Sequence, residues 1–324
     1  MTREPDDDSP YHAGERELQR RLGVRERSEQ MGRRVIRSFM PDQHRELFDE
    51  LPWILVGSLD RTGAPWASVL TGEAGFMSSP NPETLVVRAQ PARGDALAES
   101  LHIGAPLGLL AIQLETRRRN RVNGRVVEVA NEGFALHVDQ SFGNCPKYIT
   151  ARRPKLVHAP TAAAPRAESS VLSDAAVACI AASDTCFIAS ASSSNAELES
   201  DDPREGVDVS HRGGKPGFVR VDRAATRTTL VMPDFMGNNA FNTLGNLARY
   251  PRAGLLFASF ETGDMLQLTC DTEIVWDGPD VERFEGAQRL VRFGVRSGRF
   301  FEHQLPLQWF GGEPAPQLAK TGAW

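Results

Sequence analysis

The second half of the chain holds a short polar segment whose residue types could bind a phosphate. Ser210, His211 and Arg212 stand directly before Gly213-Gly214, within "DVSHRGGKPGFVRVD". A hydroxyl, an imidazole and a guanidinium can all donate hydrogen bonds to an anion, and glycines let a ligand approach the backbone. Lys215 adds a further positive charge. The same residues also suit a solvated hairpin tip, so the segment alone leaves both interpretations open.

An asparagine-rich stretch follows between 234 and 246. Its Gly237-Asn238 pair indicates a turn into a helix, with Asn238 or Asn239 as the N-cap. The first turn of a helix offers free N–H groups and a favourable dipole to an anion. Capping accounts for one asparagine, whereas Asn242 and Thr243, one turn later on the same face, favour contact with a ligand.

The first half of the chain has a cluster of arginines. Five of them fall within nine residues: Arg117, Arg118, Arg119, Arg121 and Arg125. In a strand, alternation would send Arg117, Arg119 and Arg121 to one face and Arg118 and Asn120 to the other. One set would face a ligand groove, or the run would be solvated or bind nucleic acid. The formal net charge of −5 and the lack of interleaved aromatic residues argue against nucleic acid.

The segment Phe142–Tyr148, "FGNCPKY", contains a cysteine with a lysine two residues away. Lys147 would lower the pKa of the Cys145 thiol and make it reactive. Alternatively, Cys145 is a small buried hydrophobe, as free cysteines usually are, and Lys147 and Tyr148 point into the site. Cys145 and His211 are the candidates for side chains nearest a reacting atom, and no general acid or base is assigned.

Composition bounds the class of protein. The chain has 324 residues, of which 40% are hydrophobic and 24% charged, which predicts about two globular domains and excludes collagen, coiled coil and wholesale disorder. Its four cysteines form no C-x-x-C pair and no histidines stand at zinc spacing, so no metal site is predicted. No signal peptide or run of 18 apolar residues is visible. We therefore expect a reduced, cytoplasmic protein with no membrane partner.

The elements that would position these residues are mostly strands. In the first half, β-rich runs predict a six-stranded pattern with one short helix at 95–101; the expected strands are 53–59, 65–70, 84–87, 108–114, 122–129 and 134–138. We expect disorder in the first dozen residues and helices over 15–37 and just after Pro41. The Pro-, Ala- and Ser-rich segment near 152–170 indicates a linker.

The pattern then returns, which indicates an internal duplication. Gly108-Leu109-Leu110 and Glu115-Thr116 recur with identical spacing as Gly254-Leu255-Leu256 and Glu261-Thr262, and Gly63-Ala64-Pro65 is matched with Gly214-Lys215-Pro216. A repeat of whole-domain length predicts a tandem pair, packed about a pseudo-twofold axis. The expected boundaries are a helical extension (1–50), a first repeat (51–150), a linker (151–170), a second repeat (171–278), and a C-terminal helix and tail (279–324).

One pattern in the second half resembles a known family. Gly237-Asn238, a short helix, Tyr250-Pro251-Arg252-Ala253-Gly254-Leu255-Leu256-Phe257 and Leu266-Gln267-Leu268 are similar to the pyridoxamine 5′-phosphate oxidase-like FMN-binding split-barrel family. The segment "QSFGNCPKYI" resembles one found in predicted flavin-nucleotide-binding members. The resemblance implies a mainly β fold with flanking helices: two tandem split β-barrels related by internal duplication.

The same resemblance implies FMN between the two barrels, with Asn238 and Gln267 contacting it. The family's Ser-Arg-Lys phosphate triplet is replaced here by Phe241, Asn242 and Thr243, which argues against true pyridoxamine phosphate oxidation. Positive charge must then come from elsewhere. The expected cofactor-binding set is Ser210, His211, Arg212, Lys215, Asn238, Asn239, Asn242, Thr243, Gln267, Arg119, Arg121 and Lys147.

The function implied is an FMN-dependent oxidoreductase that acts on a small molecule. No G-x-G-x-x-G fingerprint is present, so electrons would come from a partner reductase or free NAD(P)H, and we expect a homodimer. Two alternatives stay open. One is a non-catalytic protein that binds flavin, F420 or haem; the other is a degenerate barrel pair that acts as an interaction module through the arginine run.

Overall fold

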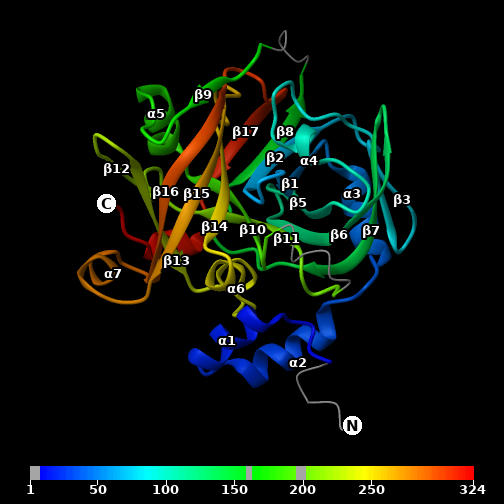
Figure 1. Ribbon diagram of the computed structural model, residues 1–324, viewed down its shortest axis with the longest axis horizontal. Coiled ribbons are helices and arrows are strands. Elements are labelled where there is room, and N and C mark those ends of the chain that lie inside the picture. Colours follow the sequence, from blue (N-terminus) through cyan, green and yellow to red (C-terminus); the bar gives the residue numbers. More distant parts are fainter. Residues whose placement is uncertain (1–7, 158–162, 195–201) are drawn as a thin grey trace.

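The computed structural model describes residues 8–157, 163–194 and 202–324, and it is built around two antiparallel sheets (Figure 1). The first sheet has the strand order β2-β1-β5-β6-β7-β4-β3. Its strands are β1 Trp53–Leu59, β2 Pro65–Thr71, β3 Met77–Asn81, β4 Thr84–Val87, β5 Pro106–Gln113, β6 Arg118–Ala130 and β7 Gly133–Gly143, with helix α4 Leu97–Ser100 between β4 and β5. We call this sheet with its helix the first unit.

The second unit repeats that plan. Its strand order, β11-β10-β14-β15-β16-β13-β12, is the first order with each strand replaced by its counterpart. Its elements are β10 Thr185–Ala191, β11 Val207–Gly213, β12 Arg220–Arg223, β13 Thr228–Phe235, α6 Asn242–Arg249, β14 Arg252–Ala258, β15 Met265–Val275 and β16 Ala287–Phe301. The predicted fold class, mainly β with an internal duplication, is confirmed, and the arrangement agrees with two tandem split barrels.

One of the two sequence markers of the duplication is confirmed by register. Leu110 in β5 lies opposite Leu55 in β1, and Leu256 in β14 lies opposite Phe187 in β10. The other marker is wrong. Pro65 begins β2, whereas Gly214–Pro216 follows the end of β11, because glycine-proline turns recur at any hairpin end and carry little positional information.

The two units pack closely through these same strands. A third hydrophobic cluster, between the cores of the two units, contains residues of both, among them Trp53, Leu110, Phe187 and Leu256. A Cβ on Gly108 would lie 2.4 Å from a β11 carbonyl, and one on Gly254 would lie 2.5 Å from a β2 Cα. β14 is the counterpart of β5, and β11 is the counterpart of β2. The contact of β5 with β11 is therefore repeated, with the units exchanged, by the contact of β14 with β2, and such an exchange indicates a pseudo-twofold axis.

The boundaries differ from the expected ones in two places, and one strand is additional. The second sheet runs on to Phe301, past the boundary placed at 278, because β16 follows the short helix α7 Pro279–Arg283. The expected linker contains β8 Ala151–Leu156 and β9 Arg166–Glu168, which pair with β17 Leu307–Glu313 and with β16; its residues 158–162 lie outside the described residues. β3 is an additional strand whose Ser-Ser-Pro-Asn composition gives no strand signal.

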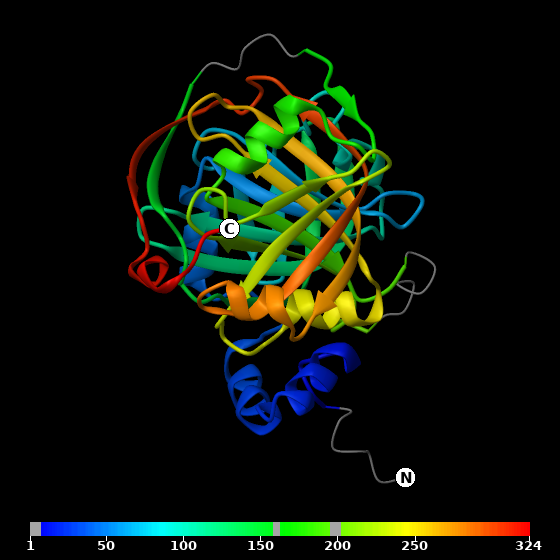
Figure 2. The same cartoon turned by 90° about the vertical axis from the view of Figure 1, so that its left-hand side faces the viewer.

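Helices flank the sheets. They are α1 Ala13–Arg21, α2 Arg25–Val35, α3 Asp42–Glu50 and α5 Asp174–Ala182, and a 3₁₀ turn, Pro316–Lys320, lies near the C-terminus. The helix expected over 15–37 is broken at Gly23, which has a φ of +67°. Figures 1 and 2 show α1 and α2 below the sheets, where α1 packs against α6. Residues 1–7 lie outside the described residues, but Tyr11 and His12 are buried, so disorder does not extend through the first dozen residues.

Candidate functional site

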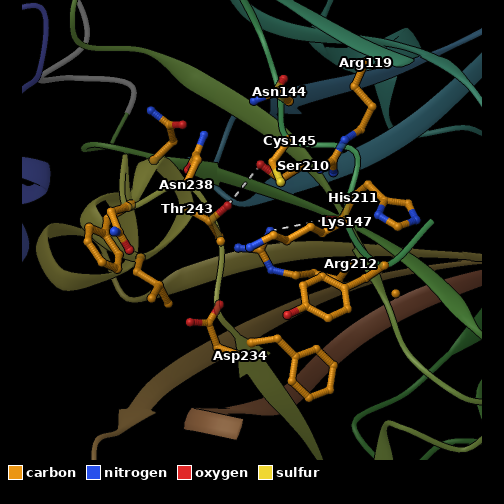
Figure 3. Close-up of a pocket in the computed structure, with 18 of the residues that line it drawn as sticks. Arg119, Asn144, Cys145, Lys147, Ser210, His211, Arg212, Asp234, Asn238 and Thr243 are labelled. Atoms are coloured by element: carbon orange, nitrogen blue, oxygen red, sulfur yellow. Dashed lines mark hydrogen bonds between the residues drawn. The ribbon is translucent and has the colours of Figure 1, made fainter. Parts of the chain in front are cut away.

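A cavity of about 130 Å³ lies where the two units meet, and we call it the junction cavity. The first unit contributes β6 and the segment after β7, and the second contributes β11, β13 and the start of α6 (Figure 3). Ten of the twelve predicted cofactor-binding residues line it, as do Cys145 and Tyr148. The ten are Ser210, His211, Arg212, Asn238, Asn239, Asn242, Thr243, Arg119, Arg121 and Lys147.

The other two predicted residues lie elsewhere. Lys215 is exposed, and its Nζ donates to the Thr321 carbonyl at 2.5 Å. Gln267 is buried in β15, where its amide donates to Ser68 and Asp95 of the first unit. Neither side chain lines the junction cavity.

The arginine run is divided between the cavity and the surroundings. Arg119 and Arg121 lie two apart in β6 and both line the cavity, as strand alternation predicts. Arg117 precedes the strand with a φ of +58°, and its guanidinium donates to the Ile149 carbonyl. The prediction of three arginines on one face is therefore right for two of them.

Arg119 is the least neutralised charge of the site. Its side chain is partly buried, its Nε is buried without a partner, and its guanidinium makes no hydrogen bond or ion pair with any residue of the described chain. Burial lowers its pKa to about 9, and the neighbouring charges of Arg212 and Arg121 add to that effect. A guanidinium still carries its charge at pH 7 under these conditions, so Arg119 presents an uncompensated cation to the cavity.

Arg121 differs because the protein already neutralises it. Its guanidinium forms an ion pair with Asp208 at 2.9 Å and donates to the Val209 carbonyl and the Ser210 hydroxyl. Thr243 donates to the same Ser210 oxygen at 3.1 Å. Arg121 thus ties β6 of the first unit to β11 of the second, beside the first turn of α6.

His211 and Arg212 line the cavity from β11 (Figure 3). His211 is 3% exposed, and burial, with Arg119 and Arg212 nearby, holds its pKa well below the usual value, so the ring is neutral at pH 7. Its Nε2 has no hydrogen-bond partner within the described chain. Arg212 donates to the His211 carbonyl, and burial lowers its pKa while Asp234 opposes that effect.

The turn before α6 is built differently from the prediction. Phe241, not an asparagine, is the N-cap, with a φ of +65° and no side-chain hydrogen bond to the helix. Asn238 instead accepts from the Ala240 amide at 3.2 Å, and Asn239 has a φ of +61°. The prediction favoured the asparagines because their side chains can cap a helix, whereas a bulky N-cap in the left-handed region is uncommon.

The N-terminal helices hold this turn in place, a feature that sequence analysis missed. The Asn242 amide donates to Glu15 at 2.5 Å, the Gln19 amide to the Ala240 carbonyl at 3.1 Å, and the Ser28 hydroxyl to the Asn239 carbonyl at 3.0 Å. Burial and the nearby Asp208 raise the pKa of Glu15 to about 8. Glu15 is the N3 residue of a capping box whose N-cap is His12, and this histidine departs from the usual serine or threonine signature, so the sequence contains no signal for Glu15.

An aromatic pair forms another part of the lining. The ring centroids of Tyr148 and Phe235 lie 5.0 Å apart, and the Tyr148 hydroxyl donates to the Met236 carbonyl. Cys145 is a free thiol that lines the same cavity. The junction cavity therefore combines a cationic, hydrogen-bonding part with an aromatic part.

Comparisons with known proteins give only distant structural similarity. No protein-family model and no curated protein matches the chain. HupZ of Group A Streptococcus aligns with 41% of this chain and 90% of its own at 13% identity and a TM-score of 0.27. A candidate pyridoxamine 5′-phosphate oxidase from Lactobacillus delbrueckii aligns with 43% of this chain and 99% of its own at 12% identity and a TM-score of 0.29. At such scores neither protein's function transfers to this chain.

The described ranges contain neither a candidate metal site nor a candidate membrane-spanning helix. No cluster of three or more histidine, cysteine or acidic side chains is placed to hold a metal ion there. None of the helices in those ranges is long and apolar enough to cross a membrane.

Proposed function

We propose that the protein is an FMN-dependent oxidoreductase that acts on a small molecule, with the flavin phosphate bound in the junction cavity. The observation that carries this proposal is Arg119, a partly buried guanidinium that faces the cavity without any partner in the described chain. Leaving a cation desolvated costs stability unless an anion compensates it. A ligand with a fixed negative charge would supply that compensation.

The charges of the lining favour a phosphate. Four cationic side chains line the cavity, namely Arg119, Arg121, Lys147 and Arg212, and Arg121 among them is already paired with Asp208; the one carboxylate of the lining is Asp234. Burial raises the pKa of Asp234, and the guanidinium groups of Arg212 and Arg289 oppose that effect. The cavity therefore has an excess of positive charge, and guanidinium groups bind phosphate oxygens through paired hydrogen bonds.

The remaining residues fit the other parts of FMN. The N–H groups at the start of α6 and the hydroxyl of Ser210 are suitable phosphate donors, and Thr243 donates to that Ser210 oxygen. Tyr148 and Phe235 offer aromatic faces of the kind against which a flavin ring packs. The orphaned Nε2 of neutral His211 is available to hydrogen-bond to a flavin edge or to the substrate.

The bound flavin would supply hydride or electron transfer at its N5 atom. The chain's residues would bind and orient the cofactor and limit the access of water, and no side chain is assigned as an acid or base. Electrons would come from a partner reductase or from free NAD(P)H. We also propose a homodimer located in the cytoplasm. The Phe241-Asn242-Thr243 sequence at the helix start still argues against pyridoxamine phosphate as the substrate.

A second candidate is a flavin-binding protein without turnover, because burial holds the pKa of His211, the histidine of the cavity, well below its usual value and keeps the ring neutral. The two candidates differ in one reaction. Reduction of the bound flavin by NADH or NADPH, followed by reoxidation by an acceptor, supports the oxidoreductase; a flavin that binds but is not reduced by either donor supports the second candidate.

Titration with FMN, followed by quenching of its fluorescence, tests the binding site. We expect Arg119→Met to weaken FMN binding at least 30-fold, on the order of 2 kcal/mol for a charge-assisted contact. The matched control is Arg153→Met, because that side chain is 77% exposed and pairs with Glu115 on the surface. Equal affinity of wild type and Arg119→Met would refute the placement of the phosphate.

A further inference from the structure

The pseudo-twofold axis gives the residues of the junction cavity that lie on β6 and β11 counterparts in the other half of the molecule. The registers define the pairs. Ser210 lies opposite Ile188, one residue along from the Phe187–Leu256 alignment, and Ser68 lies opposite Val56, one residue along from the Leu55–Leu110 alignment. Ser68 is therefore the counterpart of Ser210.

Arg121 and Gln267 are counterparts in the same way. Arg121 lies opposite Leu110, and Gln267 lies opposite Leu256. Each crosses to the other unit to make the same two contacts. Arg121 donates to the Val209 carbonyl and to Ser210, and Gln267 donates to the Ala67 carbonyl at 3.1 Å and to Ser68 at 3.0 Å.

The junction cavity and its pseudo-symmetric counterpart differ in the group beside the serine. In the junction cavity, Ser210 accepts from the neutral hydroxyl of Thr243. In the counterpart, Ser68 donates to the Asp95 carboxylate at 2.6 Å. That carboxylate also accepts from the Leu97 amide at 2.8 Å and from Gln267 at 2.8 Å. An anion with three donors therefore already occupies the counterpart, and it belongs to the chain itself.

The cationic residues of the cavity are also replaced. By the same registers, the counterpart of Arg119 is Met265, that of His211 is Val69, and that of Arg212 is Leu70. All three replacements are buried apolar side chains. The counterpart thus has no uncompensated charge and is filled by core residues.

We propose that each chain has one anion site, the junction cavity, and that its pseudo-symmetric copy is a closed site in which the Asp95 carboxylate occupies the position of the ligand's anionic group. The protein then binds one anionic ligand per chain, although the fold repeats the site twice. The ligand's anionic group lies beside Ser210 and Thr243. The identity of the ligand as FMN rests on the proposed function; the closure by Asp95 does not.

The first test is the number of ligands bound, measured by isothermal titration calorimetry of the full chain with FMN. We expect one FMN per chain, and two per chain would overturn the proposal. A companion pair of variants tests the location. Thr243→Asp places a carboxylate beside Ser210, as in the closed site, and should weaken FMN binding at least 100-fold. Thr243→Asn, whose side chain has the size of aspartate but no charge, should bind FMN at least tenfold more tightly than Thr243→Asp. Equal affinities for the two variants would contradict the proposed position.

The second test examines the closed site without any flavin. Asp95→Ala removes the carboxylate, which leaves the Ser68 hydroxyl and the Leu97 amide without an acceptor and takes one of its acceptors from Gln267. Formate, a free carboxylate of matching size, should raise the Tm of Asp95→Ala by several degrees more than that of wild type or Asp95→Asn. No differential effect of formate would overturn the closure by Asp95.

The two tests separate the two proposals. Rescue by formate in a protein that does not bind FMN would refute the proposed function and support the closed site. One FMN per chain without rescue by formate would support the function and refute the role of Asp95. If Asp95→Ala does not fold even with formate, the double variant Asp95→Gly/Gln267→Arg with formate tests the closure by Asp95 instead. Its added cation favours binding of the free carboxylate. If formate does not stabilise this variant either, the result counts against the proposal.

Discussion

Replacing Arg119 with methionine should stabilise the ligand-free protein even though it removes a charged residue from the candidate site. The replacement is the residue that the second unit itself uses, because Met265 is the counterpart of Arg119 and packs in the core between the units. Methionine keeps a long, flexible side chain in the same space, so the change removes the charge while leaving much of the packing.

The magnitude follows from the pKa. Burial lowers the pKa of Arg119 from 12.5 to about 9, a difference that corresponds to about 5 kcal/mol at 1.36 kcal/mol per unit. Because the folded pKa lies below the unfolded one, the whole penalty is present at pH 7 and fades only as the pH rises above about 9. The side chain is partly exposed, so water screens much of this penalty. We therefore expect a gain of about 1–3 kcal/mol.

The assay is thermal unfolding at pH 7 in a buffer without phosphate, with and without FMN. We expect the Tm of ligand-free Arg119→Met to exceed that of wild type by about 2–4 °C, and the same FMN concentration to stabilise the variant less than it stabilises wild type. A variant that is less stable than wild type without ligand, yet gains as much as wild type from FMN, would refute the view of Arg119 as an uncompensated cation.

Further predictions concern the surroundings of the cavity. Burial raises the pKa of Glu15 to about 8, so the wild type loses stability as the pH rises from about 4.5 to 8. In urea unfolding, Glu15→Gln should be about 1–3 kcal/mol more stable than wild type at pH 8 and nearly equal to it at pH 5. The same difference at both pH values would contradict this. Arg212→Ala combined with Asn242→Ala should weaken FMN binding without unfolding the protein, and an unchanged titration curve would argue against our placement of the phosphate. Gly108→Val should disrupt the packing of the two units, because its Cβ would meet a β11 carbonyl at 2.4 Å; a cooperative transition with an unaltered midpoint would show that the packing tolerates it.

Local sequence signals predicted much of the fold. The apolar run at Trp53–Leu59 predicted β1, and the repeated Gly-Leu-Leu predicted the duplication, because each signal is contained in a short segment of the sequence. β16 was missed since its Arg- and Gly-interrupted sequence lacks regular alternation. The extent of the second unit could be seen only from strand pairing.

The candidate site was predicted residue by residue but not as an arrangement. Ser210, His211 and Thr243 were chosen for their chemistry, and the structure brings them together with Arg119 of the other unit. Gln267 was expected at the cofactor because of the family pattern, whereas it lies at the counterpart of Arg121. The register between distant strands decides which of the two side chains, Arg121 or Gln267, lies at the cavity, and a single sequence does not show that register.

The absorbance spectrum of the purified protein, with the released chromophore identified by chromatography, tests the central claim most directly. We predict a flavin spectrum and FMN as the released compound, present at one equivalent per chain once the protein is saturated. A haem or F420 spectrum would contradict the assignment of FMN. A colourless protein that takes up no added FMN would contradict the claim that the junction cavity is a flavin site, and the arginine run would then be the first surface to test for a protein partner.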